Sequence, residues 1–300
     1  GFHYIIITIT AILALVSCST TRVLQDGEYR LAKNRITVNN PKEFNVNRLE
    51  PYIKQKPNSY FIFGWNPFLN VYNWTTGKNN GWDRFVQKIG VAPVVYDPDM
   101  VDSSIDNIKN HLIYLGYYGS EVTSDISVKK KRVEVTYNVN LGKRIPIRDI
   151  EYVLPARGPF AEAFVKDTAN MTIKPGDWLS ESALDAETVR SSAVLRNEGF
   201  YSFNKNYYFF EADTLSFPDS AILQLTINEY TRNESPRDAK PIRKFYIDDV
   251  SITYPKSLKF RNKVLEDLTT IYPGQVYSAD EINKTYSRLS ALKVFSSVNV

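Results

Sequence analysis

The chain has 300 residues, of which 43% are hydrophobic and 23% charged, and its formal net charge is +4. This composition is typical of a globular protein long enough for two or three small domains. So small a charge on 34.4 kDa does not indicate a nucleic-acid-binding protein, and no aromatic RNA-binding motif accompanies it. Twenty Tyr and sixteen Phe favour strand-rich modules with half-buried faces.

The first feature along the chain is an uncharged apolar stretch, Tyr4 to Val16, which leads to the only cysteine, Cys18. The stretch is too short to span a bilayer, but it has the length of the apolar core of a secretory signal. Small residues before a cysteine are typical of a lipoprotein processing site. We therefore predict a lipoprotein signal peptide at 1–17 and an acylated N-terminus at Cys18; the alternative is a short transmembrane anchor with an incidental cysteine.

Two further expectations follow from this start. The chain opens with Gly1-Phe2-His3 rather than with Met and a basic region, so we expect the sequence to be cut off at its start. Residues 18–28 are predicted to be a lipidated N-terminal linker. With a single cysteine, no disulfide can stabilise the exported part, and its stability must come from packing.

The rest of the chain repeats one pattern three times. Each copy opens with alternating apolar residues followed by proline, which is typical of a strand that ends there; the three openings are Arg35–Pro41, Asp149–Pro155 and Asp249–Pro255. A second landmark, predicted to be a helix end followed by a strand, recurs at Leu112–Tyr118, Leu195–Tyr201 and Leu289–Phe295. Gly116 and Gly199 stand where a helix end needs positive φ, whereas the third copy has Lys293 and is expected to end its helix less favourably.

Alternating residues at Val133–Leu141 and Leu223–Ile227 predict closing strands, and there is room for a first helix at Phe160–Asn170 and at Phe260–Thr270. Each module therefore reads strand, helix, helix, strand, strand, an α+β fold with helices on one face of a small mixed sheet. The predicted limits are module 1 at 29–142 with an aromatic insertion at about 58–96, module 2 at 143–232, and module 3 at 242–300. Module 3 lacks its last strands, so we expect the sequence to be a fragment at its C-terminus also. The polar segment Thr231 to Pro241 is predicted to be a linker.

The insertion in module 1 holds three of the four tryptophans, Trp65, Trp74 and Trp82. One interpretation is an aromatic surface that binds a partner or touches lipid headgroups beside Cys18. The other is a loop and short helix that fold back to enlarge the core of the module.

Catalytic chemistry finds little support. After Cys18 the chain has one histidine, His111, and it has no phosphate-binding loop, glycine-rich dinucleotide turn or nucleophile elbow. We expect no catalytic, cofactor or metal site and no enzyme activity. The basic run Lys129–Arg132 could meet anionic phospholipid, but its place between two strand-like runs favours a solvated hairpin turn.

The lipidated arrangement of strand-helix-helix-strand-strand modules resembles the polypeptide-transport-associated, or POTRA, domains of the BamA and TamA superfamily of outer-membrane assembly proteins. Within it the chain is similar to the TamL lipoproteins of Bacteroidetes, on the segments Cys18–Leu31, Tyr52–Asn58 and Gly90–Asp97. The resemblance spans nearly the whole chain and is strongest in module 1.

This resemblance implies a periplasmic arm, anchored to outer-membrane lipid through acylated Cys18. The arm would bind unfolded outer-membrane protein clients or a TamB-like periplasmic partner and deliver to a β-barrel that these 300 residues do not contain. Topology suggests how clients bind, because an unfolded strand can add to the edge of a sheet near Ser120–Val128 or Asn204–Phe210. The competing interpretation is a periplasmic scaffold or spacer lipoprotein without insertase activity.

Overall fold

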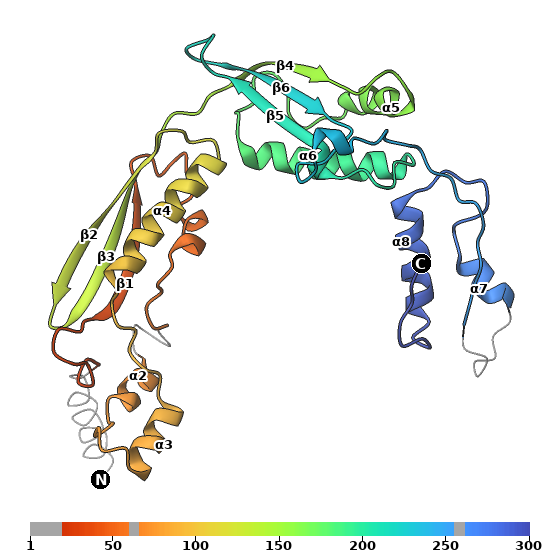
Figure 1. The fold of residues 1–300 in the computed structure, drawn as a ribbon. Coiled ribbons are helices and arrows are strands. Elements are labelled where there is room, and N and C mark those ends of the chain that lie inside the picture. Colours follow the sequence, from red (N-terminus) through yellow and green to blue (C-terminus); the bar gives the residue numbers. More distant parts are fainter. Residues whose placement is uncertain (1–19, 60–65, 255–261) are drawn as a thin grey trace. The chain divides into compact units, whose positions relative to one another are not determined.

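The fold was analysed in a computed structural model that describes residues 20–59, 66–254 and 262–300. The chain separates into two compact units, residues 1–143 and residues 144–300. Figure 1 shows a three-stranded sheet with helices on it in each unit. No helix in these described ranges has the length and apolarity needed to cross a membrane.

Unit 1 contains one sheet of three strands in the order β1-β3-β2, with β1 parallel and β2 antiparallel to the central β3. Its elements are β1 (Arg30–Val38), the 3₁₀ helices η2 (Val46–Arg48) and η3 (Glu50–Tyr52), α2 (Pro67–Tyr72), α3 (Gly81–Ile89), α4 (Pro98–Tyr114), β2 (Glu121–Lys129) and β3 (Arg132–Asn140).

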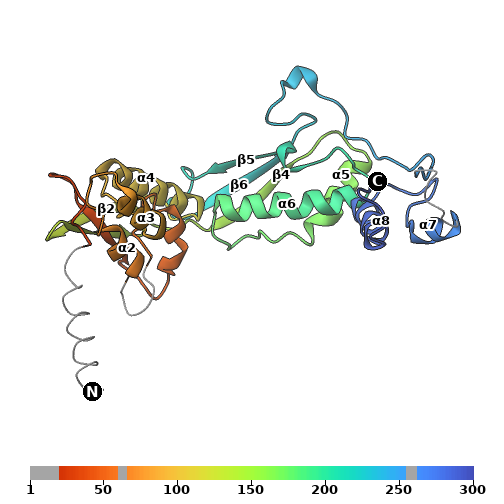
Figure 2. The same ribbon diagram turned by 90° about the horizontal axis from the view of Figure 1, so that it is seen from below.

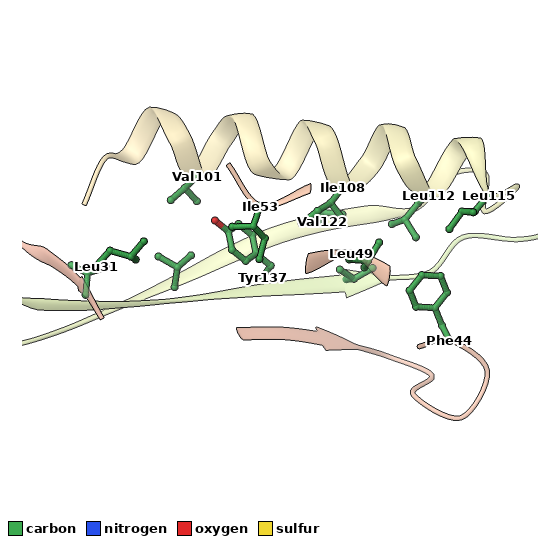
Figure 3. Close-up of a cluster of buried hydrophobic side chains, with 13 residues drawn as sticks. Leu31, Phe44, Leu49, Ile53, Val101, Ile108, Leu112, Leu115, Val122 and Tyr137 are labelled. Carbon is green, nitrogen blue, oxygen red and sulfur yellow. The ribbon is translucent and has the colours of Figure 1, made fainter. Parts of the chain in front are cut away.

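The core of unit 1 lies between α4 and the sheet. Figure 3 shows Val101, Ile108 and Leu112 of α4 pointing at the sheet, as their spacing of four and seven residues requires. The central strand β3 is buried at every second residue, from Val133 to Val139, so its alternating sequence places one face under the helix. Asp97 caps the start of α4 through its side chain, as the Asp97-Pro98 pair predicts.

Unit 2 repeats this topology. Figures 1 and 2 show the long helix α6 lying along a sheet whose strand order is β4-β6-β5, with β4 parallel and β5 antiparallel to β6. The elements are β4 (Ile147–Val153), α5 (Pro159–Thr168), α6 (Glu181–Asn197), η4 (Lys205–Tyr207), β5 (Tyr208–Asp213), β6 (Ala221–Ile227), η5 (Pro236–Asp238), α7 (Asn262–Leu268) and α8 (Ala279–Ala291). The predicted α+β fold is therefore confirmed.

Both opening strands carry the same irregularity. The register of β1 on β3 shifts between Leu31 and Lys33, and that of β4 on β6 shifts between Ile147 and Asp149. Aligning modules 1 and 2 at these bulges makes Ile147 the counterpart of Leu31. This alignment differs by two residues from the one given by the prolines that end the predicted opening strands. The equivalence also shows that β1 extends further than β4 beyond the bulge.

A short segment before the second helix returns to each opening strand. Leu31 N–H donates to the Val94 carbonyl at 2.8 Å, Ile147 to Asp177 at 2.8 Å, and Ile247 to Gln275 at 2.8 Å. Tyr96 N–H donates to Tyr29, and the corresponding bonds join Leu179 to Ile145 and Tyr277 to Phe245. We call Val94–Tyr96, Asp177–Leu179 and Gln275–Tyr277 the return segments. The first lies at the end of the stretch predicted to be the insertion, about 58–96, and is bonded to the opening strand of module 1.

A buried polar side chain recurs seven residues after the cap of each second helix. The caps are Asp97, Ser180 and Ser278, and the buried residues are Ser104, Glu187 and Thr285. The side chain of each buried residue accepts a backbone N–H from the segment that precedes the return segment. The donors are Lys54 at 3.0 Å, Thr172 at 2.9 Å and Thr270 at 3.0 Å. An equivalent internal hydrogen bond is therefore present in each of the three modules, although a different type of residue accepts it in each.

Two predicted elements differ in the structure. The first helix of module 1 is replaced by the short 3₁₀ helices η2 and η3, because Pro51 and Pro57 interrupt backbone donors there. In module 3, residues 249–254 form no strand ladder; in the described part of this module a single bridge joins Tyr246 to Val276. The opening strands β1 and β4 each pair with the last strand of their module, whereas the described residues of module 3 contain no such strand pair.

The helix ends follow the predicted pattern. Leu115 and Glu198 cap α4 and α6, and the glycines after them have φ of +85° and +103°. Lys293 occupies the same position after α8 and takes the same left-handed conformation, with φ +53°, at a cost that glycine avoids.

Inside unit 2, module 3 begins against the end of α6. Phe245 N–H donates to the Gly199 carbonyl at 2.8 Å, and the Asn197 side chain accepts the Asp280 N–H at 2.9 Å. Tyr201 packs edge-on against Phe245 and Tyr277. The predicted linker before this joint is an ordered loop, because Lys240 N–H donates to Glu229 across it.

Candidate functional site: the open strand edges

Each sheet has two edge strands, and the module treats them differently. The return segments bond the starts of β1 and β4 and so cover part of those edges. On the opposite side, β2 and β5 have the central strand as their single strand neighbour in the described part of the chain. The edge predicted near Ser120–Val128 is thus an edge strand in the structure. Of the edge predicted near Asn204–Phe210, only Tyr208–Phe210 belong to the edge strand β5, because Lys205–Tyr207 form η4.

β2 presents its backbone outward along its length. A two-residue turn, Lys130 and Lys131, joins it to β3, and both turn residues have positive φ, as a type I′ turn requires. In such a hairpin the flanking pair, Lys129 and Arg132, is the hydrogen-bonded one, and bonded pairs then alternate along the ladder. The N–H and C=O groups of Ser124, Ile126 and Val128 therefore point away from β3.

The same edge also exposes apolar side chains. Ile126 and Val128 pair with Val135 and Val133, whose side chains are fully buried on the core face of β3. Ile126 and Val128 share that face, yet they remain 49% and 51% exposed because they lie at the edge of the core. An additional strand beside β2 would place alternate side chains next to these two residues and cover them.

β5 offers a shorter edge. Arg232 Nε donates to the Tyr208 carbonyl at 2.9 Å, and Arg232 N–H donates to Asn206 at 3.0 Å, so a loop covers the start of the strand. The guanidinium also lies 6.0 Å from the Phe209 ring. The structure therefore singles out β2 as the more accessible edge.

The other face of the β2 edge is polar and internally bonded. Asn138 donates to Asp125 at 2.7 Å, and Thr37 donates to Asn138 at 2.7 Å, a ladder that crosses all three strands. The basic run at Lys129–Arg132 forms the solvated hairpin turn predicted from sequence, and the Lys131 ammonium group donates to the Gln25 carbonyl at 3.2 Å.

The residues singled out in the sequence fall in two groups. Cys18 and Trp65 lie outside the described residues. Trp74 and Trp82 are about half exposed, and they lie together, because Trp82 Nε1 donates to the Trp74 carbonyl at 3.4 Å. The core cluster of module 1 contains neither of them.

The titratable clusters have structural roles in this arrangement. Arg190 forms ion pairs with the buried Asp167 and Glu187, at 2.7 and 2.6 Å, and these hydrogen bonds raise the pKa of the guanidinium. His111 stacks on Tyr52 with ring centroids 3.8 Å apart, and its burial, followed by the charge of Arg48, lowers its pKa. Within the described ranges, no three His, Cys, Asp or Glu side chains are grouped so that they could hold a metal ion.

Comparison with known proteins identifies the class of the first module. The family model described as "POTRA: Surface antigen variable number repeat" matches residues 33–142. This match identifies module 1 as a POTRA domain, which is the resemblance inferred from the sequence at the level of the domain. No curated protein matches the chain.

Several solved structures are similar to two thirds or more of the chain. POTRA domains 3–5 of Haemophilus influenzae BamA are 15% identical, with a TM-score of 0.44 over 92% of this chain and 91% of that one. Haemophilus ducreyi BamA lacking POTRA domains 1–3 is 17% identical, with a TM-score of 0.34 over 67% of this chain and 30% of that one. The N-terminal domain of Omp85 from Thermosynechococcus elongatus is 12% identical, with a TM-score of 0.28 over 92% and 91%. Because all three TM-scores lie below 0.5, it is the family model that identifies the domain.

Sequence reasoning missed the residues that shape the two edges. Two of the return segments directly follow a Pro-Gly pair, Pro175-Gly176 and Pro273-Gly274, a turn signal that could have indicated them. Arg232 lies in a stretch that the sequence predicts to be a linker. The repeated buried acceptors Ser104, Glu187 and Thr285 could have been found, since each stands seven residues after a helix-capping residue. Their different side chains concealed the repeat.

Proposed function

We propose that this protein is the lipid-anchored periplasmic arm of an outer-membrane protein assembly or translocation factor, and that it holds unfolded client strands without catalysing a reaction. The POTRA match of module 1 and the TamL resemblance of the sequence support the class. The observation that carries the mechanism is the β2 edge, where outward backbone groups and exposed Ile126 and Val128 lie on one strand.

Strand addition to β2 fits the chemistry of such clients. Backbone hydrogen bonds give affinity without demanding a sequence, and the strands of outer-membrane barrels alternate apolar and polar residues. A client strand beside β2 would place its apolar residues next to Ile126 and Val128 and its polar residues beside Asp125. The β2 edge would therefore favour strands that alternate apolar and polar residues rather than one particular sequence motif.

The test is to replace Ile126 by proline. Its N–H points away from β3, so Ile126→Pro removes an outward donor while the β2–β3 bonds remain, and proline is tolerated at such an edge position. Crosslinking of an unfolded barrel client to a photoreactive residue at position 128 is expected to be lost. Ile126→Thr is the matched control, because it keeps the N–H and is expected to keep most of the crosslink.

Two outcomes would contradict strand addition. Equal crosslinking in Ile126→Pro and wild type would exclude the β2 backbone as the binding element. Equal losses in Ile126→Pro and Ile126→Thr would mean that the side chain, not the backbone, recognises the client. Circular dichroism of both variants establishes that the module remains folded.

The anchor and the partners belong to the same proposal. The order Leu15-Val16-Ser17-Cys18 supports acylation of Cys18, so Cys18→Ser is expected to lose label from radioactive palmitate. Retention of label in Cys18→Ser would contradict the proposed anchor. A TamB-like partner and delivery to a following β-barrel rest on the resemblance alone.

The spacer function is kept as a second candidate because of the joint in unit 2. A backbone bond and side-chain bonds connect the end of α6 to module 3, which is suited to holding two modules at a fixed distance. The two functions respond differently to the same change, since Ile126→Pro would leave a pure spacer fully active.

A further inference from the structure

The insertion of module 1 exposes several large apolar side chains. In α3, Trp82, Phe85 and Ile89 follow each other at three and four residues and so lie on one side of the helix, where they are 49%, 55% and 44% exposed. The Trp82 and Phe85 rings are 6.0 Å apart. Trp74 is 48% exposed, and its backbone carbonyl accepts the Trp82 indole N–H at 3.4 Å. We call these four residues the aromatic face.

The aromatic face is built on a well-fixed support. The buried Asp83 carboxylate accepts the Thr76 N–H at 2.7 Å and the Asn79 N–H at 3.0 Å, and these bonds lower its pKa. Gly90 ends α3 so close to α2 that an added Cβ would lie 2.6 Å from the Tyr72 nitrogen. A helix held on such a support needs little ordering of its backbone when its exposed side chains make a contact.

The same support is bonded to the chain just after the predicted lipid site. Buried Asn73, which ends α2, accepts the backbone N–H of Arg22 at 2.9 Å and that of Val23 at 3.4 Å. Four peptide units separate Cys18 from Arg22, and a chain that short reaches at most about 14 Å. An acyl chain on Cys18 therefore confines the insertion to the surface of the leaflet that holds it.

The charges around the aromatic face agree with a lipid surface. Lys78, Arg84 and Lys88 are exposed on the insertion, while its acidic residue, Asp83, is buried and bonded. A short helix with Trp and Phe on one side and basic residues around them is typical of a segment that lies in the membrane interface.

We propose that the aromatic face inserts into the headgroup layer of the membrane that holds the Cys18 anchor and thereby fixes the orientation of module 1. The proposal rests on the lipid anchor of the proposed function. An acyl chain alone leaves a domain free to turn about its tether, whereas a second contact removes that freedom. The occupant is a phospholipid surface, not a protein groove.

The test uses the intact chain in a diderm bacterium whose phospholipids carry a radioactive label. A photoreactive phenylalanine analogue is placed at Phe85, and the matched control places it at Val189, an equally exposed apolar position on α6. We expect a lipid adduct at position 85 and none at position 189. In Trp82→Ser with Ile89→Ser, which leaves Asp83 and Asn73 in place, the adduct at position 85 is expected to fall severalfold.

Two results would overturn the proposal: an adduct at position 85 with the mass of a protein, or lipid adducts that are no stronger at position 85 than at position 189. Palmitate labelling in the same cells separates this failure from failure of the anchor. Acylated Cys18 without a lipid adduct at position 85 rejects the aromatic face alone. A lipid adduct at position 85 without acylation rejects the anchor and therefore overturns the proposal that anchor and aromatic face together fix the orientation of module 1.

Discussion

At the scale of single residues, backbone conformation is unusual at four non-glycine positions of the described chain, which are Asn79, Lys130, Lys131 and Lys293. A left-handed backbone costs an ordinary residue roughly 1–2 kcal/mol, and Asn or Gly much less. Three of the four positions carry lysine. The lysines therefore carry an unfavourable conformational free energy at a hairpin turn and at a helix end, where Asn or Gly would adopt the same backbone conformation at a lower cost.

The turn offers a direct measurement of this cost. Lys130→Asn keeps the exposed position polar and supplies the residue that type I′ turns prefer, so we expect the free energy of unfolding of unit 1 to rise by roughly 0.5–1 kcal/mol. Urea unfolding followed by circular dichroism measures it. Lys129→Asn, one residue earlier in the strand, is the control and is expected to give no gain; equal gains would contradict the conformational explanation.

The carboxylate of Asp83 makes the insertion sensitive to acid. Backbone N–H groups, first that of Thr76, lower its pKa in the folded state below the ordinary 3.8. Its stabilising effect is therefore present above pH 3.8 and is lost as the pH falls through the lowered value. We expect α2 and α3 to unfold between pH 4 and strongly acid solution, with a red shift of Trp74 and Trp82 fluorescence.

The control for this pH dependence is Asp83→Asn, which removes the titrating group. The variant is expected to be less stable at neutral pH and to lose the acid transition of the insertion. An acid transition of the same size in Asp83→Asn would assign it to another carboxylate.

At the scale of elements, the second helix of each module is fixed by a buried acceptor, and in module 2 that acceptor is a charge. Glu187 is fully buried and accepts both the N–H and the hydroxyl group of Thr172, while Arg190 bonds Glu187 and Asp167 together. Ser104 and Thr285 make the equivalent bond without a charge. Module 2 therefore depends on ionic partners where its neighbours depend on hydroxyl groups.

Glu187→Ala is expected to lower the free energy of unfolding of unit 2 by roughly 3–5 kcal/mol, because the Thr172 donors lose their partner and Arg190 keeps a single counter-ion. Urea unfolding gives the value. Glu181→Ala, an exposed residue in the first turn of the same helix, is expected to cost at most about 1 kcal/mol. Similar losses in the two variants would mean that burial of the carboxylate has no special effect.

Much of the element order followed from sequence, and the reasons are local. The closing strand β3 and the helix α4 carry strict period-two and helical patterns, because one face of each is buried. The positive φ at Gly116 and Gly199 followed from a glycine before aromatic residues. These features depend on neighbouring residues, so a single sequence contains them.

The remaining features depend on contacts that are distant in sequence. The missing first helix of module 1 follows from prolines whose effect the repeat pattern concealed. In the sequence, the alternation that contains Ile126 and Val128 looks the same as that of a strand with one buried face, although both side chains are half exposed. The sequence of β2 does not show where the covering helix ends. Likewise, nothing near Asn73 reveals that it binds the backbone of Arg22, fifty-one residues earlier.

At the scale of the whole molecule, the joint in unit 2 decides how firmly module 3 is held. Gly199 lies at its centre with φ +103°, and an added Cβ would stand 2.8 Å from both Lys244 and Val276. The lysine side chain can move aside, but the Val276 methyl group belongs to a return segment that is bonded in place.

Gly199→Ala is therefore expected to loosen the joint. With Cys18 replaced by serine, spin labels at Val189 and Tyr286 should show a broader distance distribution in the variant than in the parent chain. Gly176→Ala is the matched control, because Gly176 has a similar φ of +96° but open space around its Cα. Equal broadening would trace the effect to backbone strain rather than to contact at the joint.

The covered edges of β1 and β4 have a consequence for stoichiometry. Because the return segments close the starts of β1 and β4, we expect a client strand of the proposed function to bind preferentially at the opposite edge, so that each module acts chiefly as a receptor for one strand. Several such modules in tandem would distinguish clients by the number of unpaired strands that they offer. A client with several unpaired strands is retained by avidity, which can exceed single-site affinity by about 10²–10⁴. A client whose strands have already paired with one another offers fewer unpaired strands and is released. The extent of client folding would therefore determine when the client dissociates.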